Sequence, residues 1–217
     1  SVTTLGTCVF QECTSLTTIT IPKNILYLDY LLFKSCTNLE QVIIEGNLTM
    51  IGNQTFSGCT NLKKLIIPNT VTEIGYKAFD NCTNLKEITL PNTITTITEG
   101  MFKDCTSLID VTLPEGLALI PNASFNGCIA LEKISIPSTV ITIDNSAFRG
   151  CSSLTDVEIP GSVEQIDFLA FHNCTSLENI IIPDSVVSLG GSAFSGCKNL
   201  RNIELPDNLV SIGSSAF

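Results

Sequence analysis

Residues 79–101 read FDNCTNLKEITLPNTITTITEGM, and this 23-residue unit determines the fold of the chain. Its apolar residues begin with Phe79, Cys82 and Leu85. The unit repeats in steps of 23 residues without insertion or deletion, and Phe217 begins a tenth copy. The repeated Phe and Cys columns are Phe10 and Cys13, Phe33 and Cys36, Phe56 and Cys59, Phe79 and Cys82, Phe102 and Cys105, Phe125 and Cys128, Phe148 and Cys151, Phe171 and Cys174, and Phe194 and Cys197. Repetition at a period of about 20–50 residues predicts a solenoid, in which each unit forms one coil.

Each unit contains one predicted strand, which residues 85–90 represent in the quoted stretch. Ile88 and Leu90 alternate with the polar Thr89, and this is the periodicity of a strand with one buried face. Pro91 has no N–H to donate to a strand ladder, so it is expected to close the strand.

A Gly or Asp column predicts a turn before the chain returns to the next Phe. This column holds Gly6, Asp29, Gly52, Gly75, Asp144, Asp167, Gly190 and Gly213. Both residue types tolerate the backbone of tight turns. The Ala-Phe-x-x-Cys segment that follows has i, i+3 spacing, which is typical of one turn of 3₁₀- or α-helix.

Stacking is required because a single coil cannot bury enough apolar surface to fold alone. Stacked coils place equivalent residues one strand spacing apart, at roughly 4.7–4.9 Å. The Phe and Cys columns should therefore form unbroken structural stripes. We expect one solenoid over residues 1–217 with about nine and a half units. Neither end carries a polar capping unit, so the chain is expected to be truncated at both ends.

The repeat resembles the BspA-type leucine-rich repeat over the whole chain. The motif that carries the resemblance is P-x-x-[VIL]-x-x-[IL]-G-x-x-A-F-x-x-C-[TS]-x-L, and only the unit with Ile44-Glu45-Gly46 lacks the proline after the strand. The resemblance implies a right-handed leucine-rich-repeat superhelix with a parallel β-sheet on its concave face. It also implies short β, 3₁₀ or helical turns on the convex side, and adhesion to host extracellular-matrix and plasma proteins.

The charge balance excludes two classes of partner. The chain has 21 acidic and 11 basic residues, with a formal net charge of −10. Nucleic acids and anionic membrane surfaces both need clustered Lys and Arg, so neither is expected to bind. No apolar stretch approaches the roughly 20 residues that span a bilayer, so we expect no membrane insertion by this segment.

Of the ten cysteines, the nine that share one column are predicted to be structural thiols. Nine lie in one column, where parallel side chains have the wrong Cβ geometry for disulfides. Their spacing does not suit zinc either. A buried small apolar residue is the expected role, whereas Cys8 is expected to be exposed. His172 occupies a polar surface position without a nucleophile constellation. The sequence thus predicts no catalytic residue, no metal and no cofactor.

The outward residues of the predicted strands vary from unit to unit, unlike the core columns. They form the candidate protein-binding face: Glu40, Ile43, Lys63, Lys64, Ile66, Lys86, Thr89, Thr112, Asp156, Glu158, Glu178, Ile181 and Glu204. Ile43 and Ile66 should form an apolar spot beside the lysines, and an acidic stretch should follow towards the C-terminus. The alternative is a solvated face on which pairs such as Glu40 with Lys63 serve only solubility and register.

The leading hypothesis is a non-enzymatic module of a cell-surface or secreted protein that adheres to host proteins. An intracellular, cytoplasmic scaffold of the same architecture is the alternative. Two further alternatives are an enzyme whose catalytic domain lies outside these residues, and a structural spacer.

Overall fold

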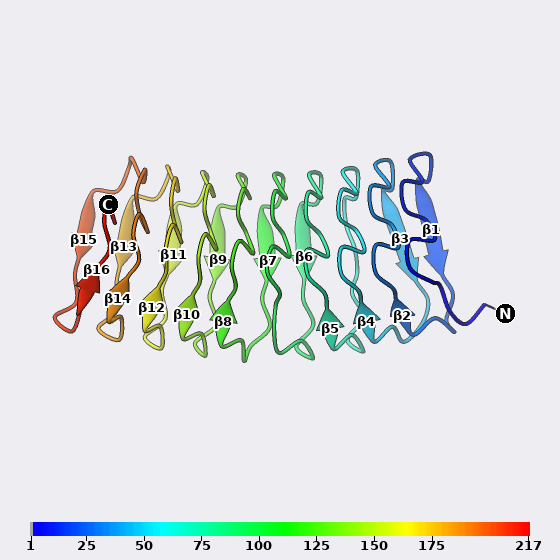
Figure 1. The fold of residues 1–217 in the computed structure, drawn as a ribbon, viewed down its shortest axis with the longest axis horizontal. Helices are drawn as coiled ribbons and strands as arrows, with labels where there is room; N and C mark the ends of the chain where they lie inside the picture. Colours follow the sequence, from blue (N-terminus) through cyan, green and yellow to red (C-terminus); the bar gives the residue numbers. More distant parts are fainter. Residues whose placement is uncertain (1) are drawn as a thin grey trace.

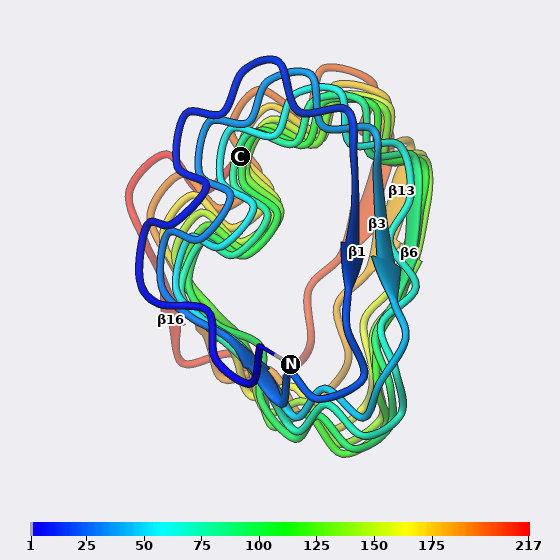
Figure 2. The same cartoon turned by 90° about the vertical axis from the view of Figure 1, so that its right-hand side faces the viewer.

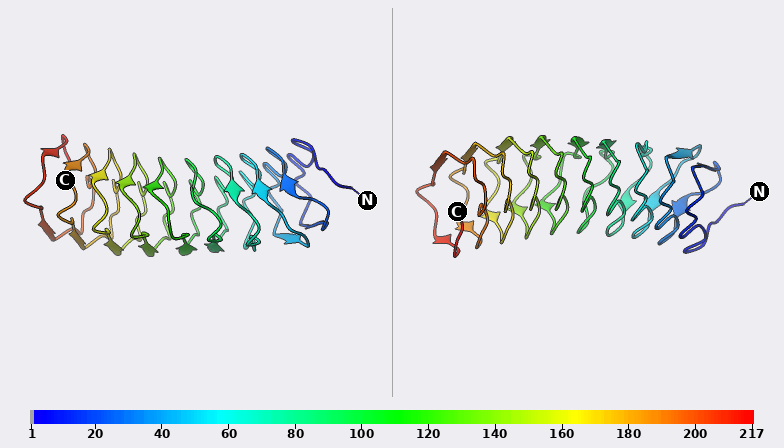
Figure 3. Two further views of the ribbon diagram at one scale, coloured as in Figure 1. Left: turned by 90° about the horizontal axis from the view of Figure 1, so that it is seen from below. Right: turned by 90° about the horizontal axis from the view of Figure 1, so that it is seen from above.

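The computed structural model describes residues 2–217 as a column of similar coils stacked in chain order (Figure 1). The N-terminal and C-terminal coils lie at opposite ends, and the column extends lengthwise in two further views (Figure 3). Within the described residues every regular element is a β-strand and none is a helix. The predicted solenoid is confirmed.

The first strand ladder runs along one side of the coils. Its strands are β1 (Thr18–Ile21), β3 (Gln41–Ile44), β6 (Glu87–Thr89), β7 (Asp110–Thr112), β9 (Lys133–Ser135), β11 (Asp156–Glu158), β13 (Asn179–Ile181) and β15 (Asn202–Glu204). Pairing is parallel and in phase, so that Ile19 lies beside Val42, 23 residues later. The predicted register is therefore correct, but the strands are shorter than predicted, since β6 covers only Glu87–Thr89 of residues 85–90.

A second ladder of two-residue strands runs along another side of the coils and is interrupted at residues 96–97 (Figure 2). Its strands are β2 (Tyr27–Leu28), β4 (Met50–Ile51), β5 (Glu73–Ile74), β8 (Leu119–Ile120), β10 (Thr142–Ile143), β12 (Gln165–Ile166), β14 (Ser188–Leu189) and β16 (Ser211–Ile212). They also pair in parallel at the 23-residue step. Of the forms implied for the return leg, the structure thus has the short β form.

The first ladder is divided into pairs of strands. β1 pairs with β3, β6 with β7, β9 with β11, and β13 with β15. Residues 63–67 lie between β3 and β6 without forming a strand, and one isolated bridge joins Lys64 to Gln41. The seams between the pairs leave room for hollows on this face, as described below.

The phenylalanine column forms one continuous stack through the core. Ten rings follow one another from Phe10 to Phe217, with centroids 5.1–5.6 Å apart and planes inclined by 3–17°. Parallel offset rings of this kind bury large areas and add a specific attraction. The predicted Phe stripe is confirmed from the first coil to the last.

The cysteine column is buried and also polar in its contacts. Each thiol from Cys36 to Cys197 donates a hydrogen bond to the carbonyl oxygen of the Phe 26 residues earlier, at 2.9–3.2 Å between Sγ and O. All ten cysteines are free, as predicted for the nine of the column. Burial raises the pKa of each of these eight thiols, and it raises the pKa of Cys197 to about 11. The column therefore links neighbouring coils as well as filling the core.

The Ala-Phe-x-x-Cys segment forms separate turns because left-handed residues interrupt it. Cys82 N–H bonds to the Phe79 carbonyl within one turn, whereas Asn81 N–H bonds to the Lys103 carbonyl of the next coil. Asn81 has a φ of 58°, which breaks the run of right-handed residues that a helix needs. Lys77 has a φ of 51°, and its column is left-handed in all ten units.

The Gly and Asp column has a different role from the one that the sequence predicts. Gly75 is not among the residues of positive φ. A Cβ at Gly75 would lie 2.5 Å from the backbone nitrogen of Asn53 in the preceding coil. Close approach of two coils, rather than a left-handed turn, therefore explains the glycine.

Candidate protein-binding face

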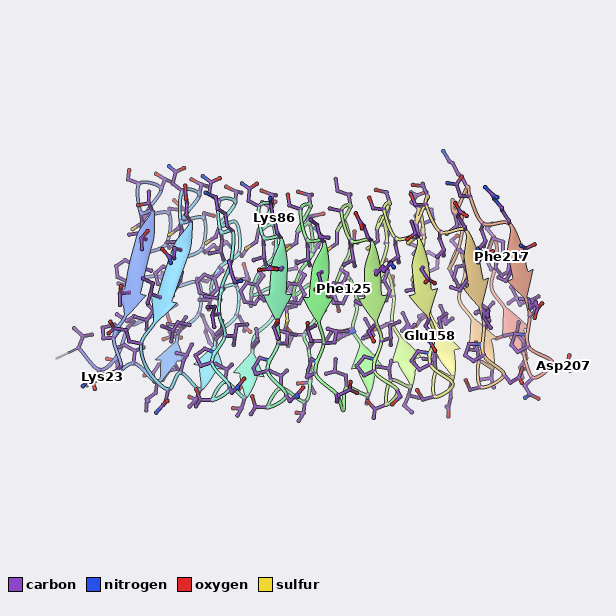
Figure 4. All side chains as sticks on the ribbon, turned by 180° about the vertical axis from the view of Figure 1, so that it is seen from behind. Lys23, Lys86, Phe125, Glu158, Asp207 and Phe217 are labelled. Carbon is purple, nitrogen blue, oxygen red and sulfur yellow. The ribbon has the colours of Figure 1, made fainter. Side chains whose placement is uncertain are left out.

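The thirteen predicted face residues are all exposed on the outward side of the first ladder. Alternation along the strands produces this placement, because Val42 of β3 is buried while Gln41 and Ile43 on either side are exposed. Figure 4 shows the column from behind, with the side chains drawn and with Lys86 and Glu158 labelled. We call the exposed residues of the first ladder and of residues 63–67 the strand face.

The structure brings five predicted residues together around one hollow. Glu40, Ile43, Lys63, Lys64 and Ile66 line a depression of about 790 Å³ between β3 and residues 63–67. Ile66 is 74% exposed beside Ile43, which is 41% exposed, so the hollow presents two neighbouring aliphatic side chains to solvent. The predicted apolar spot beside lysines is therefore present as a physical feature.

Two ion pairs cross this part of the face, as the alternative of a solvated face expects. Lys63 Nζ lies 2.7 Å from Glu40 Oε2, and Lys64 Nζ lies 2.7 Å from Glu87 Oε1. The hydrogen bond and charge of Lys64 lower the pKa of the Glu87 carboxyl. Exposed pairs of this kind add little stability, so the lysines remain available to a partner carboxylate. No salt bridge involves Lys86 within residues 2–217.

Smaller hollows lie at the seams of the ladder and also within one strand pair, since residues of β9 and β11 line one of about 610 Å³. Lys64, Ile66 and Thr89 line one of about 370 Å³ beside β6. Thr112 lines another of about 330 Å³ between β7 and β9. A third of about 370 Å³, between β11 and β13, is lined by Asp156, Glu158 and Ile181, among others. Lys86, Glu178 and Glu204 are exposed on the face but line none of these hollows.

Sequence reasoning missed one residue that lines the largest hollow. Gly46 lines it, in the only unit that lacks the proline after the strand. A Cβ at Gly46 would lie 2.5 Å from the carbonyl oxygen of Lys23. The departure from the proline rule was the available signal. Its link to the hollow depends on coil spacing, which the sequence does not give.

The groups that resemble catalytic or metal-binding residues do not assemble into a site. Burial and the nearby Arg149 lower the pKa of His172, and its Nδ1 has no hydrogen-bond partner. Among the described residues, no three His, Cys, Asp or Glu side chains are placed to hold a metal ion. Cys8 is half-buried, which corrects its predicted full exposure. Cys8 has a φ of 61° and belongs to the same left-handed column as Lys77.

Comparison with known families gives a decisive match over the whole chain. The model of the "BspA type Leucine rich repeat region" family matches in six copies, over residues 1–109, 31–151 and 119–217. The chain belongs to this family. Leucine-rich-repeat proteins of this kind are generally non-enzymatic repeat modules for protein interaction. No curated protein matches the chain.

Solved structures of bacterial leucine-rich-repeat proteins share the fold. A leucine-rich repeat protein from Bacteroides ovatus is 37% identical with a TM-score of 0.92, over 98% of this chain and 55% of that one. A leucine rich cell surface protein from Faecalibacterium prausnitzii is 25% identical with a TM-score of 0.55, over 92% and 82%. The pneumococcal vaccine antigen PcpA, at 21% identity and a TM-score of 0.61 over 87% and 56%, shows the fold alone. The chain thus spans little more than half of the Bacteroides protein.

No helix in the described part of the chain has the length and apolar character to cross a membrane.

Proposed function

We propose that this chain is a non-enzymatic binding module of a cell-surface or secreted protein, and that its strand face adheres to host proteins. The observation that carries the proposal is the hollow between β3 and residues 63–67. It combines exposed isoleucines with lysines on columns that vary between units. The description of the Faecalibacterium relative as a cell surface protein supports this location.

The hollow defines the chemistry of the ligand. Ile43 and Ile66 offer an apolar surface of the kind that forms the centre of a binding hot spot. Lys63 and Lys64 line it with positive charge on a chain that is acidic overall, and Lys86 lies on the next coil. A protein segment with an apolar side chain flanked by Asp or Glu matches both features.

An intracellular scaffold remains the second candidate, because it would use the same face in the same way. The two differ in the partner, since a scaffold would bind proteins of its own cell. Binding to host matrix proteins therefore separates them.

Charge reversal tests the proposal directly. Immobilised fibronectin and fibrinogen are exposed to the wild-type chain and to the double variant Lys63→Glu/Lys64→Glu. Loss of the lysines should weaken binding about tenfold or more, since charges beside a buried centre control partner choice. The matched control is Arg149→Glu/Lys198→Glu, which makes the same change of charge at exposed positions off the strand face. Equal binding by all three proteins, or no binding by any, would contradict adhesion through this hollow.

A further inference from the structure

The charges of the strand face, and of the residue just before each strand, have opposite signs at several positions that are related by reversing the order of the coils. These pairs are Glu40 with Arg201, Lys63 with Glu178, and Asp110 with Lys133. At these positions the face is complementary to its own reversed copy. We propose that the strand face binds a second copy of this chain, face to face and antiparallel. This goes beyond the proposed function, because a second copy of the chain is a different partner for the same face.

A two-fold axis parallel to the strands defines the arrangement. Such an axis reverses the order of the coils and keeps every residue at its position along the strand. β3 then lies opposite β15, and residues 63–67 lie opposite β13. β6 lies opposite β11, and β7 lies opposite β9 next to the axis.

Three ion pairs then form at equivalent strand positions. Glu40 meets Arg201, and Lys63 meets Glu178, both at the residue just before the strand. Asp110 meets Lys133 at the first residue of β7 and β9. Each pair occurs twice because the contact is isologous. All of these side chains are exposed in the single chain.

The apolar residues meet in the same alignment. Ile66 and Ile181 are the most exposed aliphatic side chains of the strand face, at 74% and 76%. They occupy the same strand position, in residues 63–67 and in β13, and so lie opposite each other. Two isoleucines that each face water in the single chain would therefore bury one another.

A shift by one coil in one direction is disfavoured, because it places Lys63 on Arg201 and Asp110 on Asp156. A shift in the other direction places Glu40 on Glu178 but also Lys64 on Asp156, so it is the competing alignment. The variant Glu178→Lys separates the two, because it removes an ion pair from the proposed alignment and a like-charge contact from the competing one.

One pair of like charges remains in the favoured register. Glu87 lies opposite Asp156, at the first residue of β6 and β11. Glu87 already accepts a hydrogen bond from Lys64 at 2.7 Å, which neutralises its charge. Lys86, the neighbouring residue, faces the same region and is free to approach Asp156.

The dimensions of the face predict a reversible dimer. Eight coils spaced roughly 4.8 Å apart make the face about 40 Å long, and the three or four outward residues along each strand make it about 10–13 Å wide. The projected area of the face is therefore about 400–500 Å². A standard stable interface takes about 800 Å² from each partner. We therefore expect dissociation in the micromolar range and weaker pairing at high salt.

Sedimentation velocity over a concentration series tests the pairing. The wild-type chain should shift from monomer to dimer as concentration rises, and less so in high salt. Glu178→Lys and Lys63→Glu should each weaken the dimer about tenfold or more, since each loses two ion pairs. The double swap Lys63→Glu/Glu178→Lys should restore affinity to within about threefold, because the opposed charges are again opposite.

The aliphatic pair supplies a matched control. Ile181→Thr should weaken the dimer, whereas Val210→Thr, at a residue 83% exposed off the strand face, should not. Circular dichroism confirms that each variant keeps its fold. Monomers at every soluble concentration, or a double swap weaker than either single variant, would overturn the pairing.

Failure of the pairing can be distinguished from failure of host adhesion. A monomeric chain that binds fibronectin or fibrinogen through Lys63 and Lys64 retains the proposed function and loses only the second copy as a partner. A dimer without affinity for either matrix protein retains the pairing and rejects host adhesion.

Discussion

At the scale of single residues, Phe125 lies between Phe102 and Phe148, with ring centroids 5.5 Å and 5.3 Å away. Phe217, at the last coil, stacks on one neighbour only and is 50% exposed. Phe125→Ala should therefore cost about 3–5 kcal/mol of unfolding free energy, whereas Phe217→Ala should cost less than half as much. Urea unfolding followed by circular dichroism measures both, and similar losses would contradict stabilisation by two-sided stacking.

Single positions also show what the sequence could and could not reveal. The Phe and Cys columns were predictable, because a fixed period places like residues on one another. The hydrogen bond from Cys59 Sγ to the Phe33 carbonyl was not, since it joins different columns of adjacent coils. The ion pair of Lys63 with Glu40 was predictable, because both occupy one variable column.

At the scale of elements, two glycines are required for different reasons, one for its left-handed backbone and the other for the close approach of the preceding coil. Gly150 has a φ of 74°, and a Cβ there would meet nothing closer than 3.8 Å. Gly75 has an ordinary backbone, but its Cβ would lie 2.5 Å from the Asn53 nitrogen. Gly150→Ala should cost about 1 kcal/mol for the left-handed backbone, and Gly75→Ala about 2–3 kcal/mol because backbone must move.

Thermal or urea unfolding of these two variants provides the measurement, with the wild-type chain as reference. A greater loss for Gly150→Ala than for Gly75→Ala would reject close coil approach as the reason for the Gly75 column.

Strand positions were predictable for one ladder more readily than for the other. Residues 87–89 combine alternation with a closing proline, so the strand there follows from the pattern. The two-residue strands such as β5 are too short to show a period. The turn segments could not be predicted from residue types, since non-glycine residues such as Lys77 adopt the left-handed conformation.

At the scale of the whole molecule, the pattern fixed the phase of the coils but not the spacing between them. In-phase stacking follows from the constant period, and the thirteen face residues emerge on one side as expected. The division of the first ladder into strand pairs depends on small differences between adjacent coils. The hollows along the seams, including the one that carries the proposed function, were therefore not readable from a single unit.

The buried thiols predict how the whole column responds to alkaline pH. Burial raises the pKa of eight thiols, so the folded chain retains protons that the unfolded chain loses. A raised folded pKa gives stability that is fully present below the unfolded value, near 8.5, and is lost as pH rises towards the folded value. For Cys197 this window extends to about pH 11.

The stability of the column should therefore fall steeply above about pH 8.5, by up to about 1.4 kcal/mol per pH unit for each buried thiol. Urea unfolding between pH 7 and pH 10 measures this dependence. Cys128→Ala should be less stable than the wild type at pH 7, because it loses the hydrogen bond from Sγ to the Phe102 carbonyl. It should nevertheless lose stability more slowly with pH, by the contribution of one thiol. Equal slopes for the two proteins would show that the buried thiols do not govern the alkaline response.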